Sequence, residues 1–143
     1  MIIIAGPCQY ESLDMALEIA ETCKNICNTY SVDYVFKASY DKANRTSHSG
    51  ERGLGIEKTL LGFEEIKKQL DVKITTDIHE SYQADLIKKI VDVIQIPAFR
   101  SRQTDLIRSA INTGKIVNIK KGQFMAPWDI DGILSKCKDG HEV

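Results

Sequence analysis

Hydrophobic residues recur along the chain with two alternating periods. Apolar runs rich in β-branched residues predict five strands, at residues 2–5, 33–38, 72–76, 92–96 and 116–120. After each run, apolar residues recur every three or four positions, which is the spacing of one buried helix face. This spacing predicts five helices. The first begins at Ser12, the second lies near 56–70, the third begins at Ser81, and the last two cover 103–112 and 129–138. The pattern therefore predicts five βα units.

The helical spacing also names the side chains expected to face the core. Ser12 is a suitable N-cap for the first helix, because its hydroxyl can accept a hydrogen bond from a free N–H group of the first turn. The expected core positions are Leu13, Ala16, Leu17, Ala20, Cys23, Cys27, Ile56, Leu60, Phe63, Ile66, Leu70, Ala84, Ile87, Ile90, Leu106, Ala110, Ile111, Ile130, Ile133, Leu134 and Cys137.

Alternating strands and helices predict a parallel sheet with right-handed crossovers. An open doubly wound sheet and a closed barrel both satisfy this pattern. An open sheet gathers its active side chains at one switch point, whereas a (β/α)8 barrel uses the carboxyl ends of all its strands. Polar clusters follow all five predicted strands here. The predicted fold is therefore α/β, a (β/α)8 TIM barrel of which this chain supplies about five βα units.

The length of the chain limits how much of a barrel it can form. A complete barrel needs about 250 residues and eight units, whereas this chain has 143 residues. Residues 1–143 are expected to form a single partial barrel domain with two edge strands and an exposed apolar face. Such a chain either pairs with another copy or fragment, or is a truncated relative of a longer enzyme.

Composition narrows the class of protein. With 43% hydrophobic residues the chain is expected to fold, and 19 basic against 20 acidic residues leave a net charge of −1. A near-neutral chain argues against a nucleic-acid binder with a wholly basic surface. No run of about eighteen apolar residues predicts a membrane span, so a cytoplasmic location is expected. The four cysteines are expected to be thiols, and Cys23 and Cys27 to lie on an apolar helix face.

Against this neutral background, residues 36–47 concentrate basic and hydroxyl side chains directly after a predicted strand. Lys37, Lys42 and Arg45 lie among serine, threonine and asparagine residues. Arginine offers a planar fork for phosphate and lysine a compact point charge, so the cluster suits anionic ligands. The alternative is a solvated basic loop without a ligand.

Four segments together resemble the 3-deoxy-D-manno-octulosonate 8-phosphate synthase family. They are Ile4-Ala5-Gly6-Pro7-Cys8, residues 35–45, Gln95-Ile96-Pro97-Ala98-Phe99 with Arg102-Gln103-Thr104-Asp105, and residues 118–124. The resemblance runs in order from residue 2 to about 138. It implies a (β/α)8 barrel that condenses phosphoenolpyruvate with arabinose 5-phosphate and releases phosphate, on a route to lipopolysaccharide. It also implies a homo-oligomer, a tetramer in that family.

The resemblance implies roles for individual residues. Lys37, Lys42 and Lys120 would contact phosphoenolpyruvate, with Lys42 and Lys120 as the catalytic candidates. Arg102 would reach the sugar phosphate, from its own or a neighbouring subunit. The remaining implied substrate contacts are Asn44, Arg45, Thr46 and Gln95.

The resemblance also implies a metal ligand. Family members with cysteine at the position of Cys8 belong to a metal-dependent class, in which the thiolate binds a divalent ion, zinc or iron(II), with a histidine, a glutamate and an aspartate. Those other ligands lie on later strands, which this sequence does not contain. Without the resemblance, Cys8 would be read as a small buried residue.

Two other functions remain open. One is the related 3-deoxy-7-phosphoheptulonate synthase, which uses erythrose 4-phosphate. That enzyme carries Lys-Pro-Arg-Thr or Lys-Pro-Arg-Ser where this chain has Lys42-Ala43-Asn44-Arg45. The other is a binding or assembly remnant that keeps the anion loops without catalysis.

Overall fold

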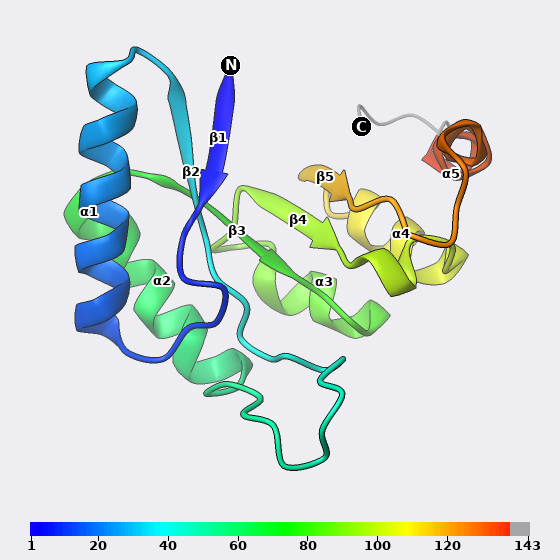
Figure 1. The fold of residues 1–143 in the computed structure, drawn as a ribbon, viewed down its shortest axis with the longest axis horizontal. Helices are drawn as coiled ribbons and strands as arrows, with labels where there is room; N and C mark the ends of the chain where they lie inside the picture. Colours follow the sequence, from blue (N-terminus) through cyan, green and yellow to red (C-terminus); the bar gives the residue numbers. More distant parts are fainter. Residues whose placement is uncertain (138–143) are drawn as a thin grey trace. The chain divides into compact units, whose positions relative to one another are not determined.

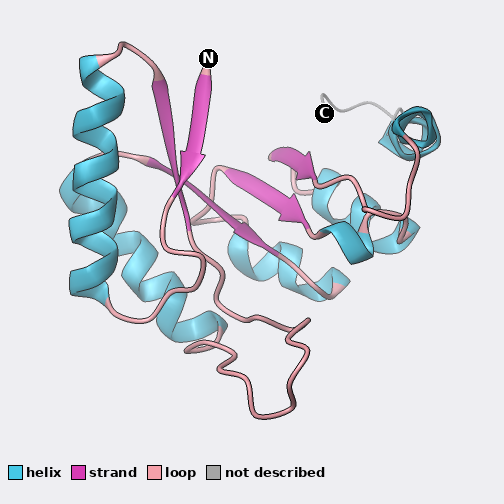
Figure 2. Ribbon diagram, in the orientation of Figure 1, coloured by secondary structure: helices cyan, strands magenta, loops and turns pink. Residues whose placement is uncertain are grey.

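The computed structural model describes residues 1–137 as five strands that alternate with helices (Figures 1 and 2). The strands follow one another in the sheet in sequence order, β1-β2-β3-β4-β5. This confirms the predicted α/β fold with five βα units, as in a (β/α)8 barrel. The chain divides into two compact units, Met1–Thr76 and Asp77–Val143, which are described separately. Residues 139–143 and the last residue of the predicted helix 129–138 lie outside the described part.

The first unit contains three strands and two long helices. The strands are β1 (Ile2–Ala5), β2 (Asp33–Lys37) and β3 (Lys73–Asp77), whose last residue already belongs to the second unit. The helices are α1 (Leu13–Thr29) and α2 (Ile56–Leu70). β1 pairs in parallel with β2, and β2 with β3. α1 packs against both β2 and α2 (Figure 1).

The start of α1 and the core of this unit agree with the sequence pattern. The Ser12 side chain accepts a hydrogen bond from the Met15 N–H at 3.3 Å, so Ser12 is the N-cap, as predicted. Phe63 of α2 lies edge-on to Phe36 of β2 and to Tyr10, with ring centroids 6.1 and 5.8 Å apart. These aromatic contacts attach α2 to the sheet and to the segment that follows β1.

The second unit contains β4 (Val93–Ile96), which pairs in parallel with β5 (Ile116–Ile119). Its helices are α3 (Ser81–Ile87), α4 (Thr104–Ile111) and the short α5 (Ile130–Leu134). α3 packs against α4. The carboxyl end of β3 is tied to β4, because the Ile78 N–H donates to the Gln95 carbonyl at 3.0 Å.

The last predicted helix is only partly correct. Residues 127–137 form two short 3-10 turns, Pro127–Asp129 and Ser135–Cys137, on either side of α5. Leu134 was expected in the core but is exposed, whereas Ile133 is buried. Because each helical residue turns by about 100°, the residue that follows a buried Ile133 faces away from the core.

All four cysteines are free thiols, as expected, and Cys27 is buried while Cys23 is half-buried. Among residues 1–137 there is no helix with both the length and the apolar character that a bilayer crossing would require.

Candidate functional site

Two loops of the first unit are held together by backbone contacts, and they carry most of the predicted site residues. The Ser39 N–H donates to the Cys8 carbonyl at 3.3 Å, and the Tyr10 N–H donates to the Ser39 carbonyl at 3.0 Å. At Gly6 an added Cβ would lie 2.1 Å from the carbonyl oxygen of Lys37. Only glycine permits this approach, so Gly6 lets the segment after β1 lie against the end of β2.

Two lysines meet at one buried hydroxyl. Ser39 is fully buried, and its Oγ accepts hydrogen bonds from Lys42 Nζ at 2.7 Å and from Lys37 Nζ at 3.3 Å. Both lysine side chains are half-buried. The shared hydroxyl holds two positive charges near each other, which suits a ligand that carries more than one negative charge.

Cys8 lies against the same positive charges. A hydrogen bond from Lys42 lowers the pKa of the Cys8 thiol, and the positive charges of Lys42, Lys37 and Arg45 act in the same direction against a smaller opposing effect of burial. The thiol is exposed. At a given pH, Cys8 therefore has a larger thiolate fraction than an unperturbed cysteine, and the thiolate is the form that attacks electrophiles and binds metals.

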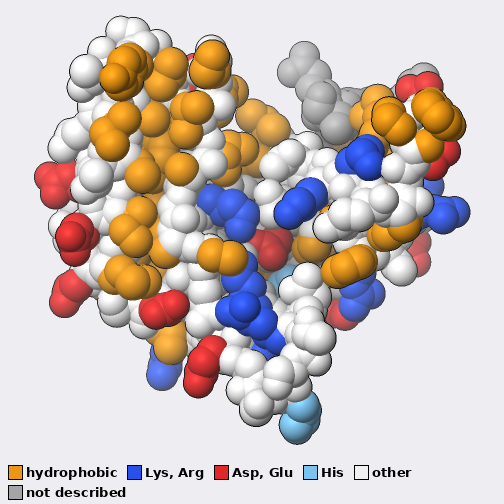
Figure 3. Space-filling model, in the orientation of Figure 1, with side chains coloured by type: hydrophobic (Ala, Val, Ile, Leu, Met, Phe, Trp, Pro, Cys, Tyr) orange, Lys and Arg blue, Asp and Glu red, His pale blue; other side chains and the backbone are white. Residues whose placement is uncertain are grey.

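Arg45 is anchored at the rim of this group. Its Nε donates to the Glu51 carbonyl at 3.0 Å, and its Nη2 donates to Gln9 Oε1 at 3.2 Å. Asn44 and Thr46 are exposed on either side of it. Figure 3 shows Lys and Arg side chains grouped beside the long loop that follows β2.

The rest of that loop is closed by its own contacts. The Lys42 N–H donates to the Arg52 carbonyl at 2.6 Å, and Arg52 Nε donates to Asp41 Oδ1 at 2.8 Å. Gly53 has a φ of 114°, and a Cβ there would lie 2.5 Å from the Tyr40 carbonyl oxygen. These contacts fix the backbone on which Lys42 and Arg45 stand.

In the second unit, polar side chains lie on neighbouring strands. Asn118 Nδ2 of β5 donates to Gln95 Oε1 of β4 at 3.2 Å, and these two residues are direct partners in the ladder. Lys120 follows β5, and its N–H donates to the Ile96 carbonyl at 3.0 Å. Within the described residues the Lys120 ammonium has no ion pair or side-chain hydrogen bond, and the residue is exposed. Its positive charge is therefore available to an anion.

Charged side chains also follow β3. His79 Nε2 lies 3.5 Å from Asp77 Oδ2, and both side chains are largely buried. Glu80 caps α3 through reciprocal contacts with Gln83 and also lies 3.4 Å from Arg100 Nη2. These contacts orient the loop, and none of these residues was assigned a role from sequence.

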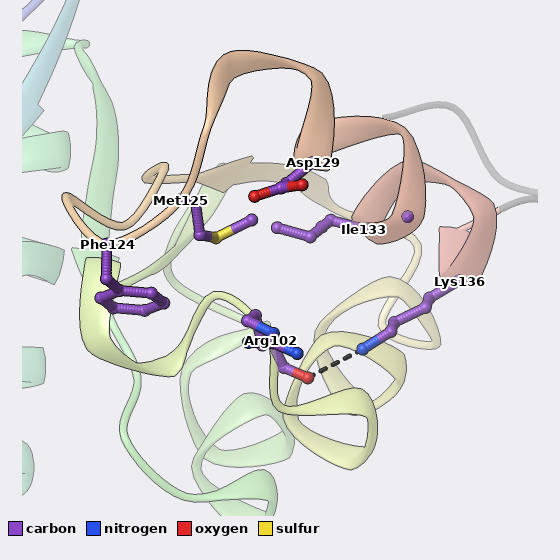
Figure 4. Close-up of a pocket in the computed structure, with 7 residues that line it drawn as sticks. Arg102, Phe124, Met125, Asp129, Ile133 and Lys136 are labelled. Atoms are coloured by element: carbon purple, nitrogen blue, oxygen red, sulfur yellow. Dashed lines mark hydrogen bonds between the residues drawn. The ribbon is translucent and has the colours of Figure 1, made fainter.

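Arg102 lines a cavity of about 390 Å³ between the loop after β5 and the final helical turns (Figure 4). Lys136 Nζ donates to the Arg102 carbonyl at 2.8 Å, and Asp129 Oδ2 accepts from the Ala126 N–H at 2.9 Å. The cavity combines two basic side chains, Arg102 and Lys136, and the carboxylate of Asp129 with an apolar wall. The apolar and small lining residues are Phe124, Met125, Gly132 and Ile133.

The structure thus groups Cys8, Lys37, Lys42 and Arg45 within the first unit. In the second unit it pairs Gln95 with Asn118 and places Arg102 in the cavity. Lys120 is not among the residues that line that cavity. The roles given to these residues stay predictions.

Sequence reasoning assigned no role to several residues that shape these groups. Ser39 lies inside the basic segment, but nothing in the sequence indicates that it is buried and bonded to two lysines. The contact of Gln9 with Arg45 and that of Lys136 with Arg102 depend on tertiary packing between distant positions, so no local pattern could have revealed them.

A divalent metal needs several ligands around one point. Among residues 1–137, no group of three or more histidine, cysteine, aspartate or glutamate side chains is arranged to hold one. Cys8 is the predicted ligand, but its thiol faces lysines. The described residues therefore do not make a complete metal site.

Comparison with known proteins identifies the family. The sequence model of the DAHP synthetase I family matches residues 1–140. The chain belongs to the DAHP synthetase I family. Among curated relatives, a protein of Nitrobacter hamburgensis is 52% identical over 138 residues, which is 96% of this chain and 48% of that protein. Its name is 2-dehydro-3-deoxyphosphooctonate aldolase.

Two further relatives in the DAHP synthetase I family are also named 2-dehydro-3-deoxyphosphooctonate aldolase. The protein of Cyanothece sp. is 47% identical over 138 residues, and that of Agrobacterium fabrum is 47% identical over 137 residues. These alignments cover 96% of this chain but 50% and 49% of the relatives. The chain spans about half the length of the curated relatives it matches.

Proposed function

We propose that this chain supplies the substrate-anion loops of a 3-deoxy-D-manno-octulosonate 8-phosphate synthase. The reaction joins phosphoenolpyruvate to D-arabinose 5-phosphate with addition of water and releases inorganic phosphate. The observation that carries the proposal is the identity of about half the residues, over nearly the whole chain, with relatives named for the eight-carbon product. Lipopolysaccharide biosynthesis would follow from that product.

The chemistry of the described residues supports the proposal. Phosphoenolpyruvate carries a phosphate and a carboxylate, and the pair of lysines on Ser39 offers two positive charges within one small group. In the proposed roles, Lys37 and Lys42 bind phosphoenolpyruvate together with Lys120. Asn44, Arg45, Thr46 and Arg102 bind the sugar phosphate, and Gln95 completes the contacts.

These residues would act mainly by binding and orientation. Holding the enol carbon of one substrate near the aldehyde carbon of the other removes much of the entropic cost of bringing them together. The ammonium groups of Lys42 and Lys120 would stabilise negative charge that develops as phosphate leaves. Charge stabilisation of this kind needs cations fixed before reaction, and the Ser39 hydroxyl supplies such a fixed position for Lys42.

Cys8 is the one residue of this chain that we propose as a ligand of a divalent metal, zinc or iron(II). The lowered pKa of the Cys8 thiol suits a thiolate ligand. Because the described residues do not complete a ligand set, no step of the reaction is assigned to a metal. The tetramer and the cytoplasmic location remain predictions.

The competing candidate is 3-deoxy-7-phosphoheptulonate synthase, which uses erythrose 4-phosphate. The matching family is named for the DAHP synthetases, so the heptulonate synthase stays a candidate. The relatives named for the eight-carbon product favour arabinose 5-phosphate. A non-catalytic remnant is the third reading.

A hybrid enzyme distinguishes the three candidate functions, which are the octulosonate synthase, the heptulonate synthase and the non-catalytic remnant. In the Agrobacterium fabrum relative, the segment matched by this chain is replaced by residues 1–138, and phosphate release from phosphoenolpyruvate is measured with each sugar, with and without a chelator. We expect turnover with arabinose 5-phosphate and little with erythrose 4-phosphate. Preference for erythrose 4-phosphate would establish the heptulonate synthase instead. No turnover from a folded hybrid, beside an active parent, would favour the remnant.

A further inference from the structure

The cavity beside Arg102 has the size and the lining of a small-molecule site. Its volume is about 390 Å³, and ligand pockets in proteins measure about 300–1,000 Å³. Such pockets are mostly apolar, with a few polar groups that orient the ligand. Here the apolar part of the lining comes from Phe124, Met125 and Ile133. All the lining residues belong to the second unit, so the cavity lies within that unit.

The apolar wall of this cavity is held in place by contacts of the loop after β5. Lys121 Nζ donates to the Gly122 carbonyl at 2.9 Å and to the Met125 carbonyl at 2.8 Å, which closes the loop. The Met125 side chain is buried, and its sulfur accepts from the buried Ser101 hydroxyl at 3.4 Å. The Phe124 ring packs on Gly122, where an added Cβ would lie 2.6 Å from the ring. The wall is therefore formed before any ligand binds.

Two positive charges lie opposite this wall. The Arg102 guanidinium has no ion pair or hydrogen bond among residues 1–137. Lys136 Nζ donates to the Arg102 carbonyl at 2.8 Å, which uses only one of the donors of the ammonium group. Figure 4 shows Arg102 and Lys136 on one side of the cavity, with Met125 and Ile133 on the other. Both cations can therefore donate to a ligand in the cavity.

The remaining charge of the lining is the Asp129 carboxylate. Its Oδ2 accepts from the Ala126 N–H at 2.9 Å, so Asp129 caps the turn that it ends. Within the described part of the chain, Asp129 forms no ion pair with Arg102 or Lys136. Two cations and one carboxylate leave the lining with a net charge of +1. A ligand with a single negative charge would neutralise this lining.

We propose that this cavity binds a small amphipathic monoanion, namely a carboxylate that carries an apolar chain or ring. The carboxylate binds between Arg102 and Lys136, because a guanidinium offers parallel donors to the two oxygens of one carboxylate. The apolar body packs against Met125 and Ile133 and thereby leaves water. The inference goes beyond the proposed reaction, since neither phosphoenolpyruvate nor arabinose 5-phosphate has an apolar body of this kind.

The test uses Trp128, the only tryptophan of the chain, as a fluorescent reporter. In the sequence Trp128 lies between the lining residues Met125 and Asp129, so its fluorescence reports on this region. The probe is 4-phenylbutanoate, added to the 143-residue chain. We expect a saturable change of fluorescence with a midpoint of about 1–10 mM, as suits a ligand of about twelve non-hydrogen atoms. No saturable binding of 4-phenylbutanoate would overturn the proposal.

Two matched probes separate the charge from the apolar body. 4-Phenylbutanol keeps the ring but not the charge, and butanoate keeps the charge but not the ring. We expect each to bind at least about tenfold more weakly than 4-phenylbutanoate. Equal binding of either would overturn the proposal.

Arabinose 5-phosphate is a further probe, because Arg102 is its proposed contact. If arabinose 5-phosphate binds and 4-phenylbutanoate does not, the cavity belongs to the substrate and the present proposal is wrong. Binding is measured without turnover, so this proposal and the proposed reaction can fail separately.

A charge variant locates the binding in this cavity. Lys136→Met removes one cation, and we expect the dissociation constant of 4-phenylbutanoate to rise at least about fivefold. Lys136→Arg keeps the charge and should restore binding. Lys89→Met is the control, at an exposed lysine outside the lining, and should change the dissociation constant by less than about twofold. Equal weakening by Lys136→Met and Lys89→Met would overturn the assignment.

A second variant leaves every charge in place. Gly132 lines the cavity, and an added Cβ would meet nothing within 4 Å. Gly132→Leu therefore places a side chain in the space of the ligand, and we expect it to weaken binding at least about fivefold. Gly132→Ala adds only a methyl group and should weaken binding by less than about twofold. Circular dichroism checks that each variant folds. Unchanged binding by folded Gly132→Leu would show that the ligand lies elsewhere.

Discussion

Ser39 is the residue on which the first basic group depends. Its buried hydroxyl accepts from two ammonium groups, and its backbone joins the segment after β1 to the loop after β2. The sequence predicted Lys37, Lys42 and Arg45 as anion contacts because their charge is local information. It could not predict Ser39, since burial and shared hydrogen bonds arise only when the two loops pack together.

Removing the Ser39 hydroxyl should loosen this group. Hydrogen bonds to charged donors contribute about 1.5–3 kcal/mol when buried, but both ammonium groups are half-buried and can regain water. We therefore expect Ser39→Ala to lower the free energy of unfolding by about 1–2 kcal/mol, measured by urea denaturation. Ser47→Ala, at an exposed loop position, should change it by less than about 0.5 kcal/mol. Equal effects would mean that the hydroxyl does not hold the lysines.

The Cys8 thiol should react at lower pH in the folded chain than in the denatured chain. Its pKa is lowered chiefly by the hydrogen bond from Lys42, so more thiolate is present at a given pH. At a pH well below the pKa, the thiolate fraction rises about tenfold when the pKa falls by one. The rate of alkylation of Cys8, followed by mass spectrometry across pH, measures this difference between the folded and denatured chains.

Lys42→Met should move that pH profile upward, because it removes the main cause of the lowered pKa. Lys58→Met, an exposed lysine of α2, is the matched control and should leave the profile unchanged. A profile that is the same in the folded and denatured chains would contradict the assigned environment of Cys8.

At the scale of elements, hydrophobic period predicted all five strands and the existence of the helices between them. The predicted helices agree with the structure where the helix is long, as in α1 and α2. It failed at residues 129–138, where Pro127 begins a 3-10 turn and the helix proper has only five residues. A short amphipathic segment gives the same pattern for an α-helix as for mixed turns, so the sequence could not separate them.

Gly6 tests how closely β1 and β2 approach at their carboxyl ends. A methyl group there would lie 2.1 Å from a backbone oxygen, and backbone cannot move aside cheaply. We expect Gly6→Ala to lower the free energy of unfolding by about 2–3 kcal/mol. Thermal and urea unfolding monitored by circular dichroism would measure the loss.

Gly132→Ala is the control for Gly6→Ala. Gly132 lies in α5, and an added Cβ would meet nothing within 4 Å. Because alanine is the better helix former, this change should stabilise the chain by about 0.5–1 kcal/mol. If Gly6→Ala were tolerated equally well, the close approach of the two strand ends would be wrong.

At the scale of the whole molecule, five parallel strands with open edges fit a chain about half as long as its relatives. Counting βα units in the sequence predicted about five units, and the structure has five strands. The sequence could not tell which edge groups stay unpaired, because strand order and register are set by tertiary pairing.

The most direct test of this account is the kcat/KM for phosphate release by the hybrid enzyme with residues 1–138, with phosphoenolpyruvate and arabinose 5-phosphate as substrates. Lys42→Met is compared with Lys58→Met, the same change at an exposed lysine of α2. We expect Lys42→Met to lower kcat/KM about 100-fold or more and Lys58→Met to change it less than about threefold. Equal losses, or full activity without Lys42, would contradict the assignment of this loop as the phosphoenolpyruvate site.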